Sequence, residues 1–589
     1  MEVKRTFDIL ERLRTYAPKA DILSAKENKE WKKYSVDDFI TNANMVSAAL
    51  LHLGLKPGDN IALMSANMPR WNFIDYGSQQ VAMPNCPIYP TINNDDLKFI
   101  LNHCEAKIIF ISDKAIYAKL LSLEKELPHL KHIVALAPID GVKSYTEFIE
   151  MGRAHYDQSK IDAIKAGISE EHILTILYTS GTTGQPKGVM LSHKNLISNV
   201  MVCQNIAPFT TKWRALSFLP LNHVYERFLN TLYLYHGVSI YYAENFETIG
   251  DNCREIHPQI FVAVPRVLER VLDRISSAGE KLSGNKKKIF DWSMRLAERY
   301  ELYGNSFWYE LQRKIADKLV YSKWRAAVGG EIVAIVSGGA ALNPRLERIF
   351  YCAGLNLLQG YGLTETCVVV AVNRFERKRR MFGTVGLVVE NSEVKIAEED
   401  GEILFKGPSV MMGYYKNADA TSEAIDAQGW FHTGDIGTLV DGKFLKITDR
   451  KKEIFKNSAG KYISPVAIEN RLKECKYIEQ CMVVGEAQKY VSALIIPEMS
   501  AFKEYCSANG IEYTKKDEMI AHEALKKLIN DHVKKVNQQL APFEQIKRQQ
   551  LINAVWGVET GEITPKLSLR RKTIYEKNKD TIAKIFGEE

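Results

Sequence analysis

The chain has 589 residues, of which 46% are hydrophobic and 25% charged, and its formal net charge is +7. These proportions are ordinary for a soluble globular protein, so they exclude a disordered chain, a collagen-like repeat and a disulfide scaffold. The length predicts several structural units, and the small mean charge argues against a nucleic-acid partner.

Signals for export or membrane insertion are also missing from the sequence. No apolar run approaches the roughly 20 residues that a membrane helix needs. The first 20 residues contain no apolar core of a secretory signal. Nine cysteines are scattered without a CxxC pair, which favours reduced thiols. We therefore expect a cytoplasmic protein.

Short apolar runs alternate with helical patterns over most of the first 449 residues. Runs that are apolar throughout suit strands of a sheet covered on both faces. Apolar positions three and four residues apart between 282 and 319 indicate helices. The alternation predicts an α/β fold with more than one sheet. The strands predicted most clearly are 106–112, 173–178, 215–219, 238–242, 260–264 and 332–336.

The pattern changes twice toward the C-terminus. Glycines separate short strands at about 381–449, which predicts a β-rich subdomain of hairpins. Further on, Ser464 and Pro465 suit a helix start, and apolar positions between 525 and 540 predict an amphipathic helix. We expect a large N-terminal domain of stacked αβ sheets over 1–449 and a small, mobile α+β C-terminal domain over 450–589.

A loop rich in glycine and hydroxyl side chains follows the strand predicted at 173–178. It reads TSGTTGQPKG over 179–188. Its hydroxyls and bare backbone amides can surround phosphate oxygens, and Lys187 adds a positive charge. The spacing is not GxxxxGK[ST], which excludes a Walker-type P-loop. On composition alone, an ordinary turn is the more frequent alternative.

Six segments, in order along nearly the whole chain, resemble the signature motifs of the adenylate-forming enzymes. This superfamily includes acyl-CoA synthetases, luciferase-like proteins and peptide-synthetase adenylation domains. The segments are YTSGTTGQPKGV (178–189), LPLNHVYER (219–227), SGGAAL (337–342), QGYGLTET (359–366), GWFHTGDIG (429–437) and DRKKEIFK (449–456). The wording of PLNHVYER, DRKKEIFK and GKYISPVAIEN (460–470) is most similar to the long-chain fatty acyl-CoA synthetases.

The resemblance implies an AMP-forming ligase. Such an enzyme converts a long-chain fatty acid and ATP into acyl-AMP and pyrophosphate, then transfers the acyl group to CoA. Two alternatives stay open within the superfamily: a fatty acyl-AMP ligase that loads a carrier protein, and a CoA ligase for another carboxylic acid. A non-catalytic lipid-binding protein is a third class of interpretation.

The resemblance also implies a role for particular residues. Glu365 and Ser180 are the implied ligands of Mg²⁺, a cation that prefers oxygen. His223 and Tyr225 border the implied acyl site, and Lys452 is the implied hinge. The implied catalytic residues are Lys566, His223 and Thr364. The implied ATP- and AMP-binding residues are Thr179, Ser180, Gly181, Thr182, Thr183, Gly184, Lys187, Gly338, Gly339, Ala340, Gln359, Gly360, Tyr361, Gly362, Thr364, Asp435, Arg450 and Lys456.

Several of these residues also have a purely structural interpretation. Glu365 can be a solvated carboxylate, and Tyr361 and Thr364 can serve packing or capping. His223 can be a satisfied, half-buried histidine. The lysines of 451–456 can form a solvated charged face, which is the usual role of such pairs.

One segment departs from the family pattern. The long-chain branch carries a catalytic lysine near the C-terminus, whereas here TPKLSLRR (564–571) has Ser568 at that position. Lys566 lies two residues earlier and would share a face with it in an extended segment. Arg570 is the alternative on the same face.

Two basic clusters account for the net charge. Residues 281–325 contain 11 Lys and Arg against 5 Asp and Glu, with Trp292, Trp308 and Trp324 among them. Residues 374–380 contain 5 Lys and Arg against 1 Glu. Such segments suit peripheral contact with an anionic membrane at its inner surface. The alternative, which the sequence favours somewhat more, is a solvated helix face with the tryptophans in the core.

Overall fold

The computed structural model describes residues 2–179, 185–512, 516–557, 560–563 and 569–587. The chain divides into two compact units. Unit 1 comprises Met1–Lys395, Leu404–His432 and Leu439–Lys446, and unit 2 comprises Ile396–Ile403, Thr433–Thr438 and Ile447–Glu589. The division at residue 449 that the sequence predicts stays a prediction, which limited proteolysis can test.

Two sheets organise unit 1. In the second sheet the spatial order is β19 (Gly413–Tyr414), β9 (Lys187–Ser192), β8 (Ile173–Thr179), β4 (Asn85–Pro87), β3 (Ile61–Met64), β5 (Ile108–Ile111), β6 (His132–Ala135) and β7 (Lys143–Ser144). In the large sheet the order is β16 (Gly386–Val388), β15 (Ala371–Val372), β14 (Leu357–Tyr361), β13 (Ala334–Ser337), β12 (Ile260–Ala263), β10 (Arg214–Ser217), β11 (Ser239–Tyr242), β1 (Leu23–Glu27) and β2 (Glu30–Tyr34).

Four further strands belong to the β-rich region predicted at 381–449. They are β17 (Glu393–Ile396), β18 (Glu402–Lys406), β20 (Phe431–Val440) and β21 (Phe444–Arg450). The division between the two units passes through all four.

The strands predicted from sequence are confirmed. The six predicted runs correspond to β5, β8, β10, β11, β12 and β13, with ends that differ by at most two residues. Strands β10, β12, β13 and β14 are mutually parallel and covered by helices, which explains why most of their residues are buried and why β12 (IFVA) is apolar at every position. The mixed α/β class predicted from the alternation is therefore confirmed.

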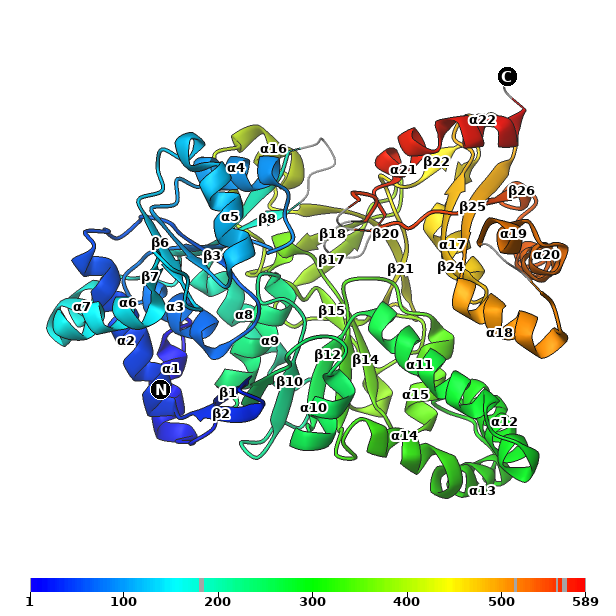
Figure 1. Ribbon diagram of the computed structural model, residues 1–589, viewed down its shortest axis with the longest axis horizontal. Coiled ribbons are helices and arrows are strands. Elements are labelled where there is room, and N and C mark those ends of the chain that lie inside the picture. The colour runs from blue at the N-terminus through cyan, green and yellow to red at the C-terminus, as the bar shows by residue number, and fades with distance from the viewer. Residues whose placement is uncertain (1, 180–184, 513–515, 558–559, 564–568, 588–589) are drawn as a thin grey trace. The chain divides into compact units, whose positions relative to one another are not determined.

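Helices of unit 1 cover these sheets (Figure 1). They are α1 (Asp8–Tyr16), α2 (Val36–His52), α3 (Pro69–Gln79), α4 (Asn94–His103), α5 (Lys114–Ser122), α6 (Tyr145–Ala154), α7 (Gln158–Ala166), α8 (His193–Cys203), α9 (Val224–Tyr235), α10 (Ile249–Ile256), α11 (Pro265–Glu280), α12 (Gly284–Glu298), α13 (Phe307–Ala316), α14 (Ser322–Ala327), α15 (Pro344–Cys352) and α16 (Ala418–Ala424).

Helix α9 joins the two sheets and is buried along most of its length. On one side, Ser217 of β10 donates a hydrogen bond of 2.6 Å to Glu226. On the other, Arg227 Nη2 lies 2.6 Å from Oδ1 of Asp75 in α3, and both side chains are buried. A buried ion pair fixes geometry more than it stabilises the fold, because desolvation offsets the attraction. These two contacts set the position of the residues that begin α9.

Unit 2 has a sheet of β24 (Ile478–Val484), β25 (Val491–Pro497) and β26 (Ile546–Leu551), and a hairpin of β22 (Phe455–Lys456) and β23 (Tyr462–Ile463). Its helices are α17 (Pro465–Leu472), α18 (Met499–Asn509), α19 (Lys516–Ala521), α20 (Glu523–Asn537), α21 (Arg571–Lys577) and α22 (Lys579–Phe586). Helix α17 begins at Pro465, as predicted, and α20 buries Leu525, Ile529 and Val533. This α+β composition confirms the expected class of the C-terminal region.

Two further features of the fold concern the helices and the cysteines. Among the described residues, no helix combines the length and the apolar character that crossing a bilayer requires. The nine cysteines are buried, free thiols.

Candidate active site

Three segments that carry candidate residues of unit 1 lie at one edge of the large sheet. Strands β10, β12, β13 and β14 are parallel neighbours, so their carboxyl ends meet at the same edge. His223 follows β10, Gly338 follows β13, and Tyr361 ends β14. Ligands of open α/β sheets bind outside the carboxyl ends of the strands. The fold thus brings together three segments that are more than 130 residues apart at their extremes.

The segment 219–227 divides into anchoring residues and residues that face this edge. Asn222 is buried and accepts a hydrogen bond of 3.1 Å from the indole of Trp71, and Arg227 is held by Asp75. His223 precedes the first turn of α9, and its Nδ1 accepts from the backbone amide of Tyr225 at 3.1 Å. With Nδ1 as acceptor, the neutral ring carries its proton on Nε2.

The ring of Tyr225 lies directly against the backbone of Gly338. A Cβ atom at Gly338 would lie 3.0 Å from both Cζ and Oη of Tyr225, so a side chain there would displace the ring. The Tyr225 hydroxyl is buried and has no hydrogen-bond partner among the described residues. Burial, and then the nearby Glu226, raises the pKa of Tyr225 well above its usual value. The hydroxyl is therefore a neutral donor in contact with the implied nucleotide turn.

The rest of that turn is shaped by glycines. Gly339 has a φ of +81°, in the left-handed region that favours glycine, and Gly339 and Ala340 are exposed. Gln359 lies beside Ser337 on neighbouring strands, and both side chains have a buried oxygen without a partner among the described residues. A Cβ at Gly362 would overlap the carbonyl of Val368, because the chain folds back there.

Tyr361 and Thr364 follow at the end of β14. Tyr361 is half-buried, and its backbone and that of Gly360 pair with β15. Thr364 is buried and begins a 3₁₀ turn, Thr364–Thr366. This short turn also carries Glu365, so Thr364 and the implied metal ligand are neighbours in one turn.

Glu365 is connected to Lys187 through a residue that the sequence did not single out. The hydroxyl of Tyr414 donates to Glu365 Oε1 at 3.0 Å. The ammonium nitrogen of Lys187 lies 5.0 Å from the centroid of the Tyr414 ring, within the range of a cation–π contact. Burial, followed by Glu365, raises the pKa of Tyr414, so its hydroxyl keeps its proton.

Pairing of three strands produces this arrangement. Tyr414 lies in β19 opposite Val189 of β9, and Lys187 begins β9 opposite Thr179, the last residue of β8. The long-range pairing of β19 with β9 brings Tyr414 next to Lys187 and Glu365. The sequence around Tyr414 contains no motif that predicts this position. Of the implied phosphate loop, Ser180, Gly181, Thr182, Thr183 and Gly184 lie outside the described residues, as does Lys566.

The carboxylate of Glu365 can be compared with what Mg²⁺ requires. Among the described residues, no group of three or more His, Cys, Asp or Glu side chains could hold a metal ion by itself. Magnesium is usually bound through one or two carboxylates together with water and substrate phosphates. A single half-buried carboxylate therefore fits an ion that shares the phosphates of a nucleotide.

Unit 2 contains the implied ribose residues. Arg450 Nε lies 3.1 Å from Asp435 Oδ1, and the Asp435 side chain is buried whereas that of Arg450 is exposed. Asp435 and Arg450 belong to two separate motifs of the sequence, 429–437 and 449–456, and their side chains are in contact in the structure. The implied hinge residue Lys452 is exposed, and the Lys456 ammonium lies 4.7 Å from the ring centroid of Tyr462.

Lys451 is exposed, as a solvated charged face requires, and it is also ion-paired. Its ammonium lies 2.6 Å from Asp400 and 2.8 Å from Glu402, and Glu402 also accepts the amide of Gly434 at 2.8 Å. These contacts link the start of the implied hinge to the segment that carries Asp435.

Sequence comparisons place the chain beside known enzymes. The AMP-binding enzyme family matches residues 11–415, and the AMP-binding enzyme C-terminal domain matches residues 453–589. The long-chain-fatty-acid–CoA ligase FadD15 of Mycobacterium bovis is 32% identical over 93% of this chain and 92% of its own. The peroxisomal long chain acyl-CoA synthetase 7 of Arabidopsis thaliana is 30% identical over 95% of this chain and 82% of its own. The human long-chain-fatty-acid–CoA ligase 1 is also 30% identical, over 93% and 81%.

Solved structures share the fold. The anthranilate CoA ligase AuaEII in complex with anthranoyl-AMP superposes with a TM-score of 0.73, covers 98% of both chains and is 18% identical. The adenylation domain of a carboxylate reductase from Mycobacterium chelonae gives a TM-score of 0.75 over 99% of this chain and 91% of its own, with 20% identity. At these identities the likeness establishes the architecture alone.

Proposed function

Because the chain belongs to the AMP-binding enzyme family, we propose that it is an ATP-dependent ligase that joins a long-chain fatty acid to CoA. The contact between Tyr225 and Gly338 supports this proposal, because these two residues belong to the segments that the resemblance implicates in binding the acid and the nucleotide. A carboxylate next to Tyr225 would then lie beside a nucleotide bound at 338–340. The names of the relatives supply the choice of a long-chain acid.

The proposed reaction has two steps. A carboxylate oxygen of the acid attacks the α-phosphorus of ATP, the bond to the β-phosphate breaks, and pyrophosphate leaves. The CoA thiolate then attacks the acyl carbon of acyl-AMP, the bond to the phosphate oxygen breaks, and AMP leaves. Activation is needed because oxide is a poor leaving group, whereas AMP is a good one.

Catalysis in the first step depends on position and charge more than on covalent chemistry. Lys187, which faces the end of β8, neutralises phosphate charge, and Thr364 donates its hydroxyl to the α-phosphate. His223 and the neutral hydroxyl of Tyr225 orient the carboxylate. Asp435 and Arg450 bind the ribose. Mg²⁺, held by Glu365 and Ser180 with the phosphates, supplies charge neutralisation when bound.

Lys566 is the proposed replacement for the lysine of the family pattern. Lys566→Ala should lower carboxylate-dependent pyrophosphate exchange by about a hundredfold, as loss of one charge-stabilising group does. Arg570→Ala should have a smaller effect. An exchange rate that survives in Lys566→Ala and collapses in Arg570→Ala would assign the role to Arg570.

The experiment that tests the function is an acid panel with and without CoA. Purified protein is given ATP, Mg²⁺ and palmitate, acetate or benzoate, and pyrophosphate, acyl-AMP, AMP and thioester are measured. With CoA we expect AMP and acyl-CoA in equal amounts with palmitate and little product with acetate or benzoate. Pyrophosphate and acyl-AMP without thioester, even with CoA present, would favour a carrier-loading acyl-AMP ligase, and absence of pyrophosphate with every acid would favour a non-catalytic lipid-binding protein.

The location belongs to the same proposal. A cytoplasmic enzyme that acts at the inner surface of a membrane would meet an acid that partitions into bilayers. Support comes from the cysteine pattern of the sequence and from the surface described next.

A further inference from the structure

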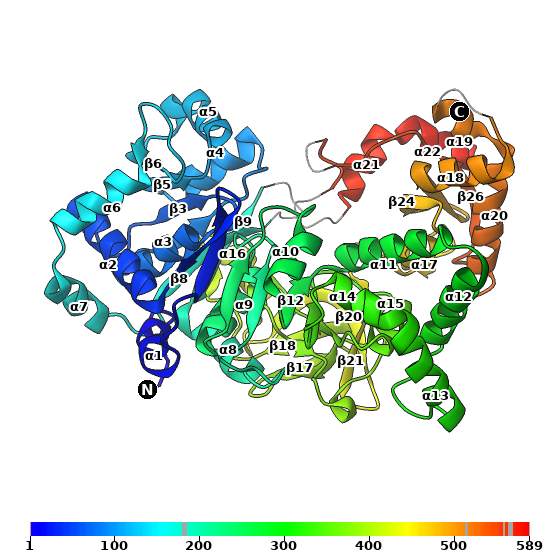
Figure 2. The same cartoon turned by 60° about the horizontal axis from the view of Figure 1, so that its bottom comes forward.

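Helix α13 and its continuation present a row of large apolar side chains to solvent. The helix runs without a break through the π-helical turn Asp317–Tyr321 into α14. In Figures 1 and 2, α12 and α13 lie at the periphery of unit 1. The exposed fractions of the five outward side chains range from 41% to 77%. These five, called the α13 row, are Phe307, Trp308, Leu311, Ile315 and Leu319.

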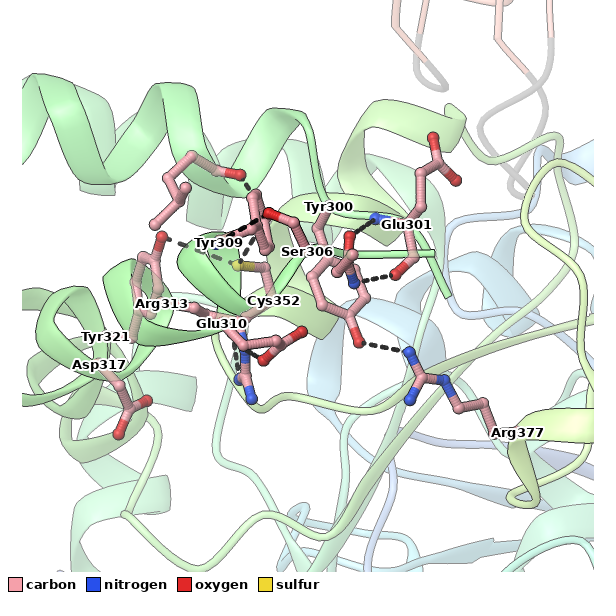
Figure 3. Close-up of polar contacts among 12 residues, drawn as sticks. Tyr300, Glu301, Ser306, Tyr309, Glu310, Arg313, Asp317, Tyr321, Cys352 and Arg377 are labelled. Carbon is pink, nitrogen blue, oxygen red and sulfur yellow. Dashed lines mark hydrogen bonds and ion pairs between the residues drawn. The ribbon is translucent and has the colours of Figure 1, made fainter. Parts of the chain in front are cut away.

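The α13 row occupies one side of the helix. At about 100° per residue, its five positions fall within roughly a third of the circumference. The opposite side is fixed to unit 1 by polar contacts (Figure 3): Tyr309 Oη donates to the carbonyl of Leu296 at 2.6 Å, and the Cys352 thiol lies 3.7 Å from Tyr321 Oη. The spacing that usually marks a buried stripe therefore marks an exposed one here.

The surrounding charges are positive and unneutralised. Every acidic side chain of 281–325 is ion-paired, at 2.6 to 2.9 Å: Asp291 with Lys287, Glu298 with Arg345, Glu301 with Arg348, Glu310 with Arg313, and Asp317 with Arg325. Eight exposed cations of the same segment have no ion-pair partner in the described part of the chain. They are Lys281, Lys286, Lys288, Arg295, Arg299, Lys314, Lys318 and Lys323.

We propose that the α13 row and these eight cations form the surface by which the protein docks on an anionic lipid bilayer, with α13 lying in the plane of the interface. Aromatic side chains such as Phe307 and Trp308 suit the boundary between headgroups and acyl chains. Lys314 and Lys318 flank the row, and their long side chains can reach lipid phosphates while the row enters the acyl region. This docking proposal rests on the proposed function at one point: a long-chain fatty acid, the proposed substrate, partitions into such a bilayer.

Charge distinguishes a bilayer from a second copy of the chain. Two copies docked row against row would bring two sets of unpaired cations together, and like charges in close contact disfavour association. An anionic leaflet neutralises them instead.

The surface is narrower than the sequence suggests. Arg374 and Arg380 of the second basic cluster are buried and donate to backbone carbonyls, so that cluster as a whole is no docking surface. Trp324 is buried, and the indole of half-buried Trp292 donates to Gln312. Only Trp308 of the three tryptophans is exposed, so including Trp292 and Trp324 in the interface is wrong.

Vesicle flotation of the full chain tests the proposal. The vesicles contain phosphatidylcholine alone, or phosphatidylcholine mixed with phosphatidylglycerol. Wild-type protein should float with the anionic vesicles, less at high salt, and stay behind with the neutral ones. Phe307→Ser combined with Trp308→Ser should lower the partition coefficient about tenfold or more. Lys314→Gln and Lys318→Gln should each lower it roughly fivefold.

Matched variants separate this surface from general apolar or charged exposure. Leu121→Ser with Tyr156→Ser removes two exposed apolar side chains elsewhere in unit 1, and Lys56→Gln with Lys114→Gln removes two exposed cations. Both controls should float like wild type. Equal flotation with neutral vesicles, or flotation unaffected in the α13 variants, overturns the proposal. The proposal is also overturned if the wild-type protein sediments as a dimer, the Phe307→Ser/Trp308→Ser variant alone sediments as a monomer, and vesicle binding is the same in both.

The docking surface and the catalytic function can fail separately. AMP formation from a dissolved medium-chain acid should be unchanged in all these variants. A protein that forms AMP but does not float overturns the docking surface alone. A protein that floats but never forms AMP overturns the proposed function alone.

Discussion

The hydroxyl of Tyr414 donates a hydrogen bond of 3.0 Å to Oε1 of Glu365. The same ring lies against the ammonium of Lys187, 5.0 Å from its centroid. One aromatic side chain thus separates a cation from a carboxylate and holds both in place. In the proposed function these two groups face the phosphates and the Mg²⁺ ion of one nucleotide.

Tyr414→Phe keeps the ring against Lys187 and removes only the hydrogen bond to Glu365. A hydrogen bond to a charged group contributes about 1.5–3 kcal/mol, so we expect kcat/KM for ATP to fall about tenfold or more, with a higher Mg²⁺ requirement. Tyr414→Leu also removes the cation–π contact, so its kcat/KM for ATP should be lower than that of Tyr414→Phe by a further several-fold. AMP formation at varied ATP and Mg²⁺, and calorimetric titration of ATP with and without Mg²⁺, measure both effects.

Tyr415→Phe is the matched control, because it removes the neighbouring hydroxyl and should leave both measurements unchanged. If Tyr414→Phe binds ATP with the wild-type Mg²⁺ dependence, Tyr414 does not position Glu365.

Gly338→Ala tests the contact that supports the proposed function. The added Cβ would lie 3.0 Å from Cζ and Oη of Tyr225, so the ring must move. The required movement is a few tenths of an ångström. Because a misplacement of about 1 Å can cost about a hundredfold in rate, we expect the smaller movement to lower kcat/KM for the acid by several-fold to about tenfold. Combined with Tyr225→Leu, the two losses should be non-additive by about 0.5–3 kcal/mol. Pyrophosphate exchange provides the double-mutant cycle.

Gly250→Ala is the control for a glycine on the surface, because its Cβ would make only an ordinary contact with Arg254. Additive losses in the cycle would show that Tyr225 and Gly338 act independently, against the proposed juxtaposition.

Asp435 and Arg450 should contribute unequally to nucleotide binding. Asp435→Asn removes the buried carboxylate that the proposed function assigns to the ribose hydroxyls, and we expect AMP affinity to fall about tenfold or more. Arg450→Ala should lower AMP affinity only several-fold, because the Arg450 side chain is exposed and exposed ion pairs contribute little to binding. Calorimetric titration with AMP distinguishes the two, with Lys446→Ala of the same strand as the control. Equal effects would argue that the Asp435–Arg450 pair, not Asp435 itself, forms the site.

Glu226 gives the stability a specific pH dependence. Burial raises the pKa of Glu226 to about 8, although hydrogen bonds from Ser217 and Asn230 oppose the shift. In the unfolded chain a glutamate titrates near ~4.3, so between these values the native state binds more protons and stability falls as pH rises. Glu226→Gln removes this titration. Its free energy of unfolding relative to wild type should rise by up to about 1.4 kcal/mol per pH unit across this window.

Urea denaturation between about pH 5 and pH 8 measures that slope. Glu124→Gln replaces an exposed glutamate and should keep the wild-type slope. A wild-type slope in Glu226→Gln would show that the Glu226 carboxyl is ionised throughout the range.

Local signals predicted much of the fold and part of the site. Strands such as β5 and β12 were predictable because a strand covered on both faces is apolar at nearly every position. The residues at strand ends, such as Gly338 and Tyr361, followed from motifs that the parallel strands then bring to one edge. Tyr414 was not predictable, because its place depends on β19 pairing with β9, more than 200 residues earlier.

Helix α13 shows a second limit. The positions of Trp308, Leu311 and Ile315 have the spacing of a core-facing stripe, yet all three are exposed. Periodicity identifies the apolar side of a helix but not what covers it. The contacts of Tyr309 and Tyr321 on the other side decide which side is buried.

Following labelled palmitate through a single turnover, first without and then with CoA, tests the claim that the protein joins the acid to CoA through acyl-AMP. We predict that palmitoyl-AMP and one equivalent of pyrophosphate accumulate without CoA. Adding CoA should convert the bound palmitoyl-AMP to palmitoyl-CoA and release an equal amount of AMP. Formation of ADP and phosphate instead, or palmitoyl-AMP that stays unchanged after CoA is added, would contradict the claim.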